Sequence, residues 1–415
     1  MHFLYNTGIH IYSLALWLAS PFHTKARLFR AGRRHLFKRL EAAMTGEAAA
    51  VWFHCASLGE FEQGRPLLEA YRRQCPEHTI LLTFFSPSGY EIQKNYAGAD
   101  WVFYLPLDTP RNARRLIDIV RPRTAIFIKY DFWYNILHTL QKEGVPIYVV
   151  SAIFHPSQLF FKRYGGFFRK MLRTCRQLFV QDDYSRELLA SIGIANVQVS
   201  GDTRFDRVRE LAQAPRPMPH LDAFLAGRPA LVAGSTWPAD EDRLEAAFAA
   251  LPERVKLIIA PHEIDEEHIA NIERRFRRFG AVRYSALSGA LQPAAWRESR
   301  TLILDTIGML SAAYRYGAVA YVGGGFSASG IHNTLEAAVY GLPVVFGPNY
   351  ARFREACDLI TQGGAASYTN RKKLESILLQ WFTDDGARQA AGSISRQYVI
   401  AHCGATETIL KAIAF

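Results

Sequence analysis

The chain has 415 residues, of which 49% are hydrophobic and 21% are charged, and its formal net charge is +11. This composition predicts a globular protein, and the length favours two domains over a single core. The five cysteines are scattered, without a CxxC pair or a cluster with histidine, which argues against a disulfide framework and a zinc site. The charge favours anionic partners, and without a helix-turn-helix, zinc-finger or RNP pattern a lipid or phosphorylated substrate is favoured over nucleic acid.

The first 40 residues contain no acidic side chain and combine an apolar run with a basic cluster. The run from Gly8 to Ser20 is too short to span a bilayer, and without a basic leader before it we expect no cleaved signal peptide. The basic residues that follow are Lys25, Arg27, Arg30, Arg33, Arg34, Lys38 and Arg39. An apolar helix beside basic residues is typical of a segment that lies on an anionic membrane. The alternative is a first helix that packs on its own domain.

From Ala50 to about Leu211, short β-branched and aromatic runs alternate with helical patterns. The predicted strands are Val51–Cys55, Thr79–Phe85, Trp101–Leu105, Thr124–Ile128, Ile147–Val150, Leu178–Val180 and Val197–Ser200. Strands separated by helices indicate a parallel sheet that is covered on both faces.

A second series of the same kind follows a proline-rich segment. Its predicted strands are Ala230–Ala233, Val255–Ala260, Thr301–Leu304, Val319–Val322 and Leu342–Phe346, and the tail from Arg371 to Phe415 is helical by pattern. We predict an α/β protein with a membrane-associating segment at 1–40, an N-terminal domain at 41–212, a linker at 213–229, a C-terminal domain at 230–395 and a C-terminal helix at 396–415. Two doubly wound domains would leave a cleft between the C-terminal ends of their sheets, where ligands of open α/β sheets bind.

The stretch from residue 318 to 348 reads as a strand, a glycine-rich turn, a helix and a strand. Gly323, Gly324 and Gly325 permit a sharp turn close to a ligand, and the helix is expected to begin near His332 or Asn333 and to end at Gly341. A glycine-rich turn that runs into a helix N-terminus suits a phosphate, and Glu336 is positioned to accept from ribose hydroxyls. The alternative is that Asn333 and Glu336, which have capping-box spacing, only start the helix.

Three loops of the N-terminal domain follow predicted strands and carry charged residues. Glu60 lies in a small-residue turn at a helix start, where the helix dipole would keep it ionised and able to act as a base. Asp131 and Arg204 follow other strands of the same sheet, so we expect them to point into the same cleft. Taken alone, Glu60 could merely complement the helix dipole, and Asp131 and Arg204 could each be a cap or a surface charge.

Together these loops resemble the Kdo transferases (3-deoxy-D-manno-octulosonic acid transferases), glycosyltransferases with the GT-B fold. The segment ASLGEF at 56–61 looks like the family's A-S-x-G-E loop, YLPLD at 104–108 matches its Y-x-P-x-D segment, and GDTRFD at 201–206 is similar to G-N-x-K-F-D. Later signatures are matched by AGST at 233–236, DTIGML at 305–310 and GIHNTLEAA at 330–338. The resemblance covers nearly the whole chain, and the order and spacing of the motifs make it specific.

The resemblance implies two Rossmann-like domains and inverting transfer of Kdo from CMP-Kdo to a lipid A precursor, lipid IVA, in lipopolysaccharide core biosynthesis. The family's base maps onto Glu60, and its two transition-state-stabilising positions map onto Asp131 and Arg204. The positions that bind CMP map onto Pro261, His262, Gly308, Met309, Leu310, Asn333, Thr334, Leu335 and Glu336. The family also implies a peripheral enzyme on the cytoplasmic face of the bacterial inner membrane, without a metal or other cofactor.

The chain departs from the family's pattern in several loops. The family's E-x-E-x-W-P appears as residues 129–134, KYDFWY, so Lys129 reverses a charge and Asp131 keeps a carboxylate on a shorter arm. The family's P-R-H appears as PHE at 261–263, its N-A-R-x-S appears as SAIFH at 151–155, and Arg204 stands where the family has lysine. These departures concern donor contacts and the number of sugars added, and leave the reaction class unchanged.

Two other functions fit parts of the sequence. A GT-B enzyme that uses a UDP-sugar, as a transferase or an epimerase, would also need the glycine-rich loop and Glu336. A membrane-bound lipid-binding protein without catalysis would explain the positive charge and the N-terminal segment, but it would have no use for Glu60 beside a nucleotide site.

Overall fold

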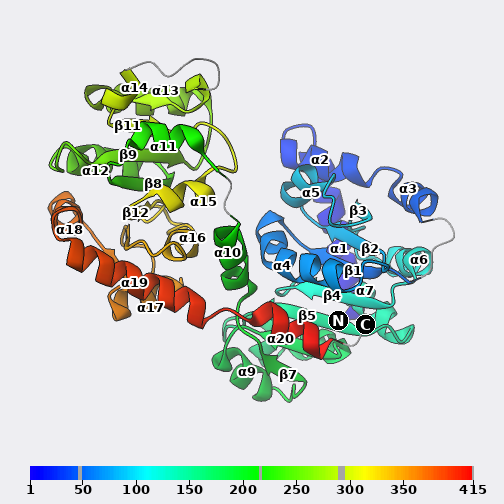
Figure 1. The fold of residues 1–415 in the computed structure, drawn as a ribbon. Helices are drawn as coiled ribbons and strands as arrows, with labels where there is room; N and C mark the ends of the chain where they lie inside the picture. Colours follow the sequence, from blue (N-terminus) through cyan, green and yellow to red (C-terminus); the bar gives the residue numbers. More distant parts are fainter. Residues whose placement is uncertain (45–48, 215–216, 288–294, 414–415) are drawn as a thin grey trace. The chain divides into compact units, whose positions relative to one another are not determined.

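The computed structural model describes residues 1–44, 49–214, 217–287 and 295–413. The chain divides into two compact units, which we call the N-terminal unit (residues 1–207 and 403–415) and the C-terminal unit (residues 208–402). Each unit contains its own seven-stranded parallel sheet with helices packed against it (Figure 1). The predicted α/β class with two doubly wound sheets is therefore confirmed.

The sheet of the N-terminal unit has the strand order β3-β2-β1-β4-β5-β6-β7. Its strands are β1 (Val51–Cys55), β2 (Ile80–Phe84), β3 (Trp101–Tyr104), β4 (Thr124–Ile128), β5 (Ile147–Ala152), β6 (Gln177–Val180) and β7 (Val197–Val199). Every residue of the central strands β1, β2, β4 and β5 is buried, which explains why these segments are continuously apolar rather than alternating.

Helices cover both faces of this sheet. They are α1 (His2–Ala19), α2 (Thr24–Arg33), α3 (Leu36–Ala43), α4 (Leu58–Gln74), α5 (Pro87–Gln93), α6 (Pro110–Val120), α7 (Tyr134–Lys142), α8 (Gly166–Thr174), α9 (Asp183–Ala190), the start of α10 (Thr203–Gln213) and the C-terminal α20 (Ala405–Ala412). The two faces carry separate clusters of buried side chains, with Trp52 of β1 in one and Phe53 in the other. Leu67 of α4 and Ile409 of α20 share the second cluster, so the end of the chain returns to the N-terminal unit.

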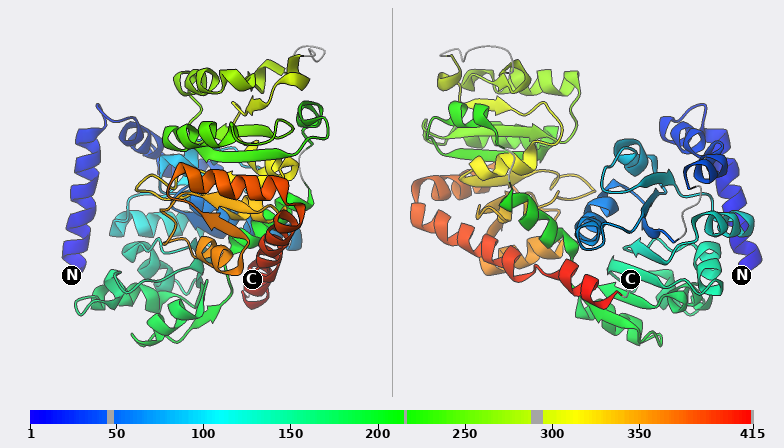
Figure 2. Two further views of the ribbon diagram at one scale, coloured as in Figure 1. Left: turned by 90° about the vertical axis from the view of Figure 1, so that its left-hand side faces the viewer. Right: turned by 45° about the vertical axis from the view of Figure 1, so that its right-hand side comes forward.

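Helix α1 lies at the outer edge of the N-terminal unit (Figure 2). It is anchored by Tyr5, whose hydroxyl donates to Oδ2 of the buried Asp108 at 2.6 Å, and by Tyr12, whose ring stacks on Phe85. The helix is longer than the apolar run recognised in the sequence, because it begins at His2. In the described part of the chain, no helix is both long enough and apolar enough to cross a bilayer.

The sheet of the C-terminal unit has the strand order β10-β11-β9-β8-β12-β13-β14. Its strands are β8 (Ala230–Thr236), β9 (Lys256–Pro261), β10 (Val282–Arg283), β11 (Thr301–Ile303), β12 (Val319–Val322), β13 (Val344–Phe346) and β14 (Ala365–Ser367). Its helices are α11 (Pro219–Leu225), α12 (Pro238–Phe248), α13 (Glu266–Arg275), α14 (Ala295–Glu298), α15 (Leu310–Ala313), α16 (Leu335–Ala338), α17 (Arg354–Gln362), α18 (Arg371–Thr383) and α19 (Asp385–Ala401). Edge strands β10 and β14 were not predicted, because two or three residues carry no recognisable period.

The division of the chain differs from the sequence-based one, since residues 1–40 are part of the N-terminal unit and the boundary between the units falls at residue 207 and not at 212. The segment 213–229 was predicted to be a linker, but it contains α11, in which Pro219 occupies the first turn and Leu221 and Phe224 are fully buried. Proline therefore starts a helix here instead of marking a flexible connection. Residues 403–415 belong to the N-terminal unit, and not to a separate C-terminal element.

Candidate functional site

Glu60 lies at the carboxyl end of the central strand β1, in the first turn of α4. Its Oε2 accepts a hydrogen bond from the backbone N–H of Ala56 at 2.5 Å, so the carboxylate caps the turn between the strand and the helix. Burial and the negative charge of Asp131 raise the pKa of Glu60 above its ordinary value, while the Ala56 N–H, His54 and Lys129 oppose that shift. The helix dipole was expected to favour the ionised form of Glu60, and burial acts against that effect by raising its pKa. A raised pKa makes Glu60 a stronger proton acceptor once it is ionised.

Asp131 follows β4, the neighbour of β1, and is held by two N–H groups. Its Oδ2 lies 2.7 Å from Nε2 of His54 and accepts from Nε1 of Trp133 at 2.9 Å. On the other side of the imidazole ring, Nδ1 of the fully buried His54 lies 2.8 Å from Oγ1 of Thr83. Trp52 donates its indole N–H to the same hydroxyl at 2.8 Å.

Two members of this chain of hydrogen bonds have fixed roles, because an indole N–H can only donate and a carboxylate can only accept. Thr83 therefore accepts from Trp52, while its own hydroxyl proton is shared between Nδ1 of His54 at 2.8 Å and the carbonyl oxygen of Phe53 at 3.5 Å. His54 then carries a proton on Nε2 and donates it to Asp131. Three adjacent strands, β2, β1 and β4, therefore orient the carboxylate of Asp131, whose charge acts on Glu60.

Arg204 lies at the start of α10, after the edge strand β7. Its Nε donates to Oδ2 of Asp202 at 2.7 Å, and its backbone N–H donates to Oδ1 of the same residue at 2.9 Å. The loop crosses back over the sheet, because Thr203 donates to the carbonyl of Gln63 on α4 at 2.5 Å. The structure thus brings Glu60 and Asp131 together and ties the Arg204 loop to the helix of Glu60, while the guanidinium itself pairs with Asp202.

The described residues contain one cluster with metal-ligand spacing, made of Cys75, Glu77 and His78 beyond the C-terminal end of α4. Tyr71 contacts Nδ1 of His78, and Arg123 lies 2.7 Å from its Nε2, so both ring nitrogens are occupied. A guanidinium at the ligating nitrogen opposes a cation there. The arrangement fits a structural hydrogen-bond group better than a metal centre.

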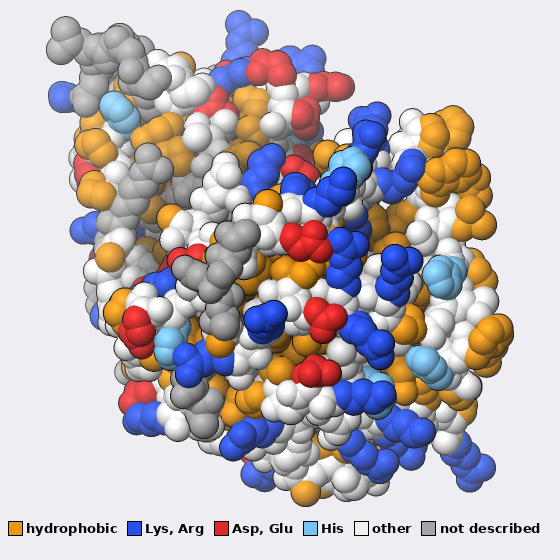
Figure 3. All heavy atoms as spheres, turned by 90° about the vertical axis from the view of Figure 1, so that its right-hand side faces the viewer, with side chains coloured by type: hydrophobic (Ala, Val, Ile, Leu, Met, Phe, Trp, Pro, Cys, Tyr) orange, Lys and Arg blue, Asp and Glu red, His pale blue; other side chains and the backbone are white. Residues whose placement is uncertain are grey.

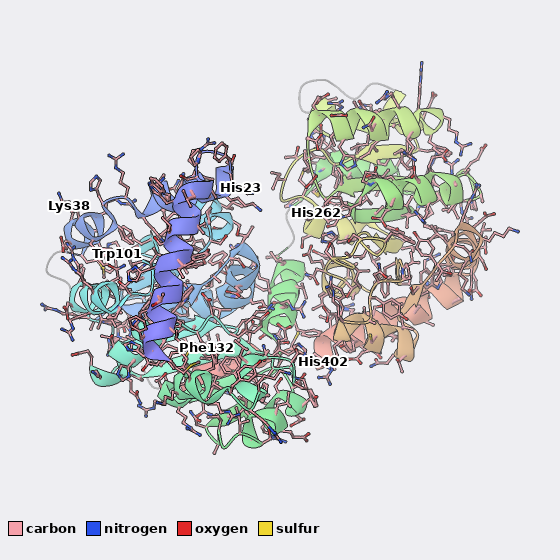
Figure 4. All side chains as sticks on the ribbon, turned by 180° about the vertical axis from the view of Figure 1, so that it is seen from behind. His23, Lys38, Trp101, Phe132, His262 and His402 are labelled. Atoms are coloured by element: carbon pink, nitrogen blue, oxygen red, sulfur yellow. The ribbon has the colours of Figure 1, made fainter. Side chains whose placement is uncertain are left out.

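In the C-terminal unit, four of the predicted donor-binding residues line one cavity of about 280 Å³. They are Pro261, the last residue of β9, His262 just after it, and Gly308 and Leu310, which follow the neighbouring strand β11. His262 marks the place in Figure 4. Met309 also follows β11, but its side chain is buried beside α15 and is not among the residues that line the cavity.

A cluster of three rings stands at the same edge of this sheet. The ring of His262 stacks on His332 with centroids 4.3 Å apart, and it lies 4.8 Å from the ring of Trp237. Trp237 donates its indole N–H to Nε2 of His332 at 3.1 Å, so this nitrogen carries no proton. Burial, together with the nearby His262, lowers the pKa of His332 to about 4, so the His332 ring is uncharged near neutral pH. Trp237 and His332 were not predicted as site residues, although both adjoin or lie in matched motifs.

The glycine-rich turn and the helix after it differ from the prediction. Helix α16 spans only Leu335–Ala338, with Thr334 and Leu335 fully buried. The side-chain amide of Asn333 donates to Oε1 of Glu336 at 3.1 Å and accepts from the N–H of Leu335 at 3.1 Å. These contacts fit the alternative that the two residues start the helix. A short helix offers a weak dipole, so the helix alone gives little support to a phosphate at Asn333, and the phosphate site stays a prediction.

The glycines are needed for contacts within the protein. A Cβ on Gly323 would lie 2.2 Å from the carbonyl oxygen of Ser235, and one on Gly325 would lie 2.6 Å from Cα of Gly347. Gly324 adopts a φ of +88°, which L side chains rarely reach. The turn is therefore glycine-rich because two neighbouring backbone segments pack against it.

Known proteins resemble this chain in sequence and in fold. Residues 30–207 match the family described as 3-Deoxy-D-manno-octulosonic-acid transferase (kdotransferase). The chain is 30% identical over 409 residues to a 3-deoxy-D-manno-octulosonic acid transferase of Bordetella pertussis, with 94% of this chain and 90% of the relative covered. It is 28% identical over 323 residues to the enzyme of that name from Aquifex aeolicus, with 76% and 81% covered.

Among solved structures, a UDP-GlcNAc 2-epimerase from Neisseria meningitidis matches with a TM-score of 0.60 at 11% identity, covering 87% of this chain and 98% of that one. At this identity the likeness concerns the fold alone, and it agrees with two Rossmann-like units of the GT-B type. The match to the Bordetella pertussis enzyme extends along nearly the whole length of both chains. The chain belongs to the 3-deoxy-D-manno-octulosonic acid (Kdo) transferases and is a glycosyltransferase.

Proposed function

We propose that this Kdo transferase moves Kdo from CMP-Kdo to a sugar hydroxyl of a lipid A precursor, lipid IVA, in lipopolysaccharide core biosynthesis. The observation that carries the proposal is the pair of carboxylates at the end of the sheet in the N-terminal unit. Glu60 is half-buried with a raised pKa, and Asp131 is fixed beside it by His54 and Trp133. Such a pair suits general base catalysis, which a lipid-binding protein would not need.

The proposed reaction is a single displacement with inversion. Glu60 takes the proton of the acceptor hydroxyl while its oxygen forms a bond to the anomeric carbon of Kdo. The bond from that carbon to the phosphate of CMP breaks, and CMP leaves with the electron pair. Asp131 keeps Glu60 basic through its negative charge, and Arg204 is proposed to offset the charge that develops in the transition state.

The cavity of the C-terminal unit is the proposed site of the donor nucleotide. Its volume of about 280 Å³ suits part of a nucleotide, and most of its lining residues are apolar, with His262 and Thr306 as the polar ones. The flat ring of His262, supported from behind by His332, offers a stacking surface for the base. Because His332 is uncharged, the selectivity proposed here rests on shape and stacking.

We further propose that the N-terminal unit attaches to the cytoplasmic face of the inner membrane through α1. Phe3, Leu14 and Leu18 expose 79%, 56% and 58% of their surface, and Phe22, just after the helix, exposes 92%. Figure 3 shows a band of hydrophobic side chains along one edge of the molecule with Lys and Arg side chains gathered beside it. Apolar anchoring combined with basic residues is the two-signal arrangement that gives stable peripheral binding.

The decisive experiment is transfer in vitro. Purified protein is incubated with CMP-Kdo and a tetraacylated, bisphosphorylated disaccharide lipid, and the lipid is weighed by mass spectrometry. A gain of one Kdo mass supports the proposed donor and acceptor, and further gains count the additions. If the mass does not change, the binding of CMP and of UDP to the protein is compared. Binding of CMP but not of UDP would support the proposed donor and reject the proposed acceptor. Binding of UDP instead would favour a UDP-sugar enzyme.

A further inference from the structure

A second cavity lies in the N-terminal unit, between α1 and α2, with a volume of about 600 Å³. Four arginines line it, Arg27, Arg30, Arg33 and Arg34, together with an apolar wall that includes Trp17 and Phe29. None of the residues proposed for catalysis or donor binding takes part in its lining. His23, which precedes α2, and Lys38 on α3 mark this region in Figure 4.

The charge of these four arginines is not balanced by the part of the chain that the structure describes. Arg33 donates only to the carbonyl oxygens of Leu105 at 2.8 Å, Phe85 at 2.7 Å and Phe29 at 3.1 Å. Arg30 donates to the hydroxyl of Ser20 at 2.7 Å. No ion pair with a carboxylate is found for any of the four among the described residues, and residues 1–40 contain no Asp or Glu. Arginines gathered without carboxylates are the usual means of recognising phosphate, because their N–H groups match its oxygens in geometry and charge.

Burial makes the imbalance more severe at the base of the cavity. The guanidinium of Arg33 lies 3.5 Å from the ring centre of Phe29 and 4.7 Å from that of Tyr104. Removal from water lowers the pKa of Arg33 to about 9. Because the guanidinium of Arg33 has lost part of its hydration, an anion in the cavity would interact with it more favourably than water does.

A continuous set of contacts leads from this cavity to the proposed catalytic carboxylate. Arg33 bonds the carbonyl of Phe85, and the ring of Phe85 packs on Trp133 with centroids 4.5 Å apart. Trp133 in turn donates to Asp131 at 2.9 Å. A ligand held by the arginines thus lies on the same side of the sheet as the site of bond formation, within one unit of the protein.

The surroundings define the ligand further. Trp17, which forms part of the cavity wall, is 54% exposed, and the neighbouring Leu18 and Phe22 are exposed too. A soluble anion would leave this apolar surface in water, whereas an amphiphile would cover it. We propose that the cavity binds a phosphate group carried by the lipid acceptor, so that its acyl chains lie along α1 and its sugar extends toward Asp131. This inference rests on the proposed function and locates one group of the same substrate.

The test uses a double variant of two exposed arginines, Arg27→Gln with Arg34→Gln, which leaves the hydrogen bonds of Arg30 and Arg33 intact. The charge-matched control is Arg111→Gln with Arg114→Gln, two exposed arginines of α6 in the same unit that do not line the cavity. Calorimetric titration measures binding of decyl phosphate, with decyl maltoside as an uncharged amphiphile and inorganic phosphate as a soluble anion. Steady-state kinetics measures the acceptor KM with and without the lipid's phosphates.

We expect the cavity variant to bind decyl phosphate about 10-fold more weakly or worse, since two charge-assisted hydrogen bonds are lost. Its acceptor KM should rise by a similar factor. The kcat, the donor KM and the KM for the dephosphorylated acceptor should equal those of the wild type. An equal loss in the α6 control would overturn the inference, because bulk charge would then explain it. Inorganic phosphate that binds as tightly as decyl phosphate would overturn it in favour of a soluble anion.

Weaker decyl phosphate binding with an unchanged acceptor KM would also overturn the proposal, because the ligand would then be a bilayer lipid. If the wild type transfers no Kdo at all, the proposed function fails, and the titration still decides the cavity. Selective binding of decyl phosphate that is lost in the cavity variant supports a lipid phosphate site. Equal binding by the wild type and the variant rejects it.

Discussion

The two units place different kinds of chemistry at the carboxyl ends of similar sheets. In the N-terminal unit, the charge of Asp131 raises the pKa of Glu60, and the two carboxyl groups are held by separate hydrogen bonds, Glu60 by the N–H of Ala56 and Asp131 by His54 and Trp133. In the C-terminal unit, His262, His332 and Trp237 form a stack beside a cavity, and burial keeps His332 neutral. The same architecture therefore supports a site governed by charge and a site governed by shape.

This difference matches what each half of a glycosyl transfer requires. A base must have a pKa tuned toward the working pH, which calls for burial and a nearby charge. A nucleotide already carries its own charge, and its base is recognised by flat surfaces whose protonation state does not change. The predictions below separate these two roles, because changes in the carboxylate site should alter turnover and its pH dependence, and changes in the ring stack should alter donor binding.

The largest effect is expected from Glu60→Gln, which keeps the shape and removes the proton acceptor. Turnover should fall about 10²-fold or more, the usual contribution of a general base, while the donor KM stays unchanged. Rates with CMP-Kdo and the lipid acceptor measure this. Glu62→Gln, a more exposed neighbour on the same helix, serves as the control. Turnover of the Glu60 variant within a few-fold of the wild type would remove Glu60 from the mechanism.

Asp131→Asn should change the pH profile as well as the rate. The charge of Asp131 raises the pKa of Glu60, so its removal lowers that pKa. Since the base must be ionised, kcat/KM rises as the pH increases through the pKa of Glu60, and the acidic limb should move to lower pH in the variant. Turnover at high pH should also fall, by about 10-fold, because a weaker base accepts the proton less readily. An unshifted limb would show that Asp131 does not act on the titrating group.

The sequence predicted the strands, the fold class and the loop of Glu60, because these depend on local apolar runs and on one turn. It did not predict the partners. His54 and Asp131 are 77 positions apart, and Trp237 and His332 are 95 apart, so their contacts exist only because β1 adjoins β4 and β8 adjoins β12. His54 read as one polar residue in a buried strand. The close packing of the glycine triplet against the backbone of Ser235 and Gly347 was not predicted either, because it joins segments that are distant in the sequence.

His54→Asn tests whether the hydrogen-bond chain matters beyond the fold. The shorter amide cannot reach both Thr83 and Asp131, so a buried donor or acceptor is left unpaired, and the free energy of unfolding should fall by about 1–3 kcal/mol. Urea denaturation measures this loss. The acidic limb of kcat/KM should also broaden or shift, since Asp131 is no longer fixed. His54→Gln, which has a longer arm, should recover part of the activity. Loss of stability with an unchanged pH profile in both variants would make His54 purely structural.

The smallest effect is expected in the C-terminal unit, from Trp237→Phe. Phenylalanine keeps an aromatic ring beside His262 but removes the N–H that His332 accepts at 3.1 Å. Without that donor, Nε2 of His332 is free to take a proton, so the pKa of His332 should rise from about 4 and the ring should gain charge at mildly acidic pH. The donor KM should then increase a few-fold, about the worth of one neutral hydrogen bond, and kcat should stay the same. Titration of His332 by NMR and donor kinetics on the same variant would check both statements. A change in kcat with an unaltered donor KM would contradict the division of roles between the two units, because it would place the ring stack in the step that Glu60 and Asp131 are proposed to control.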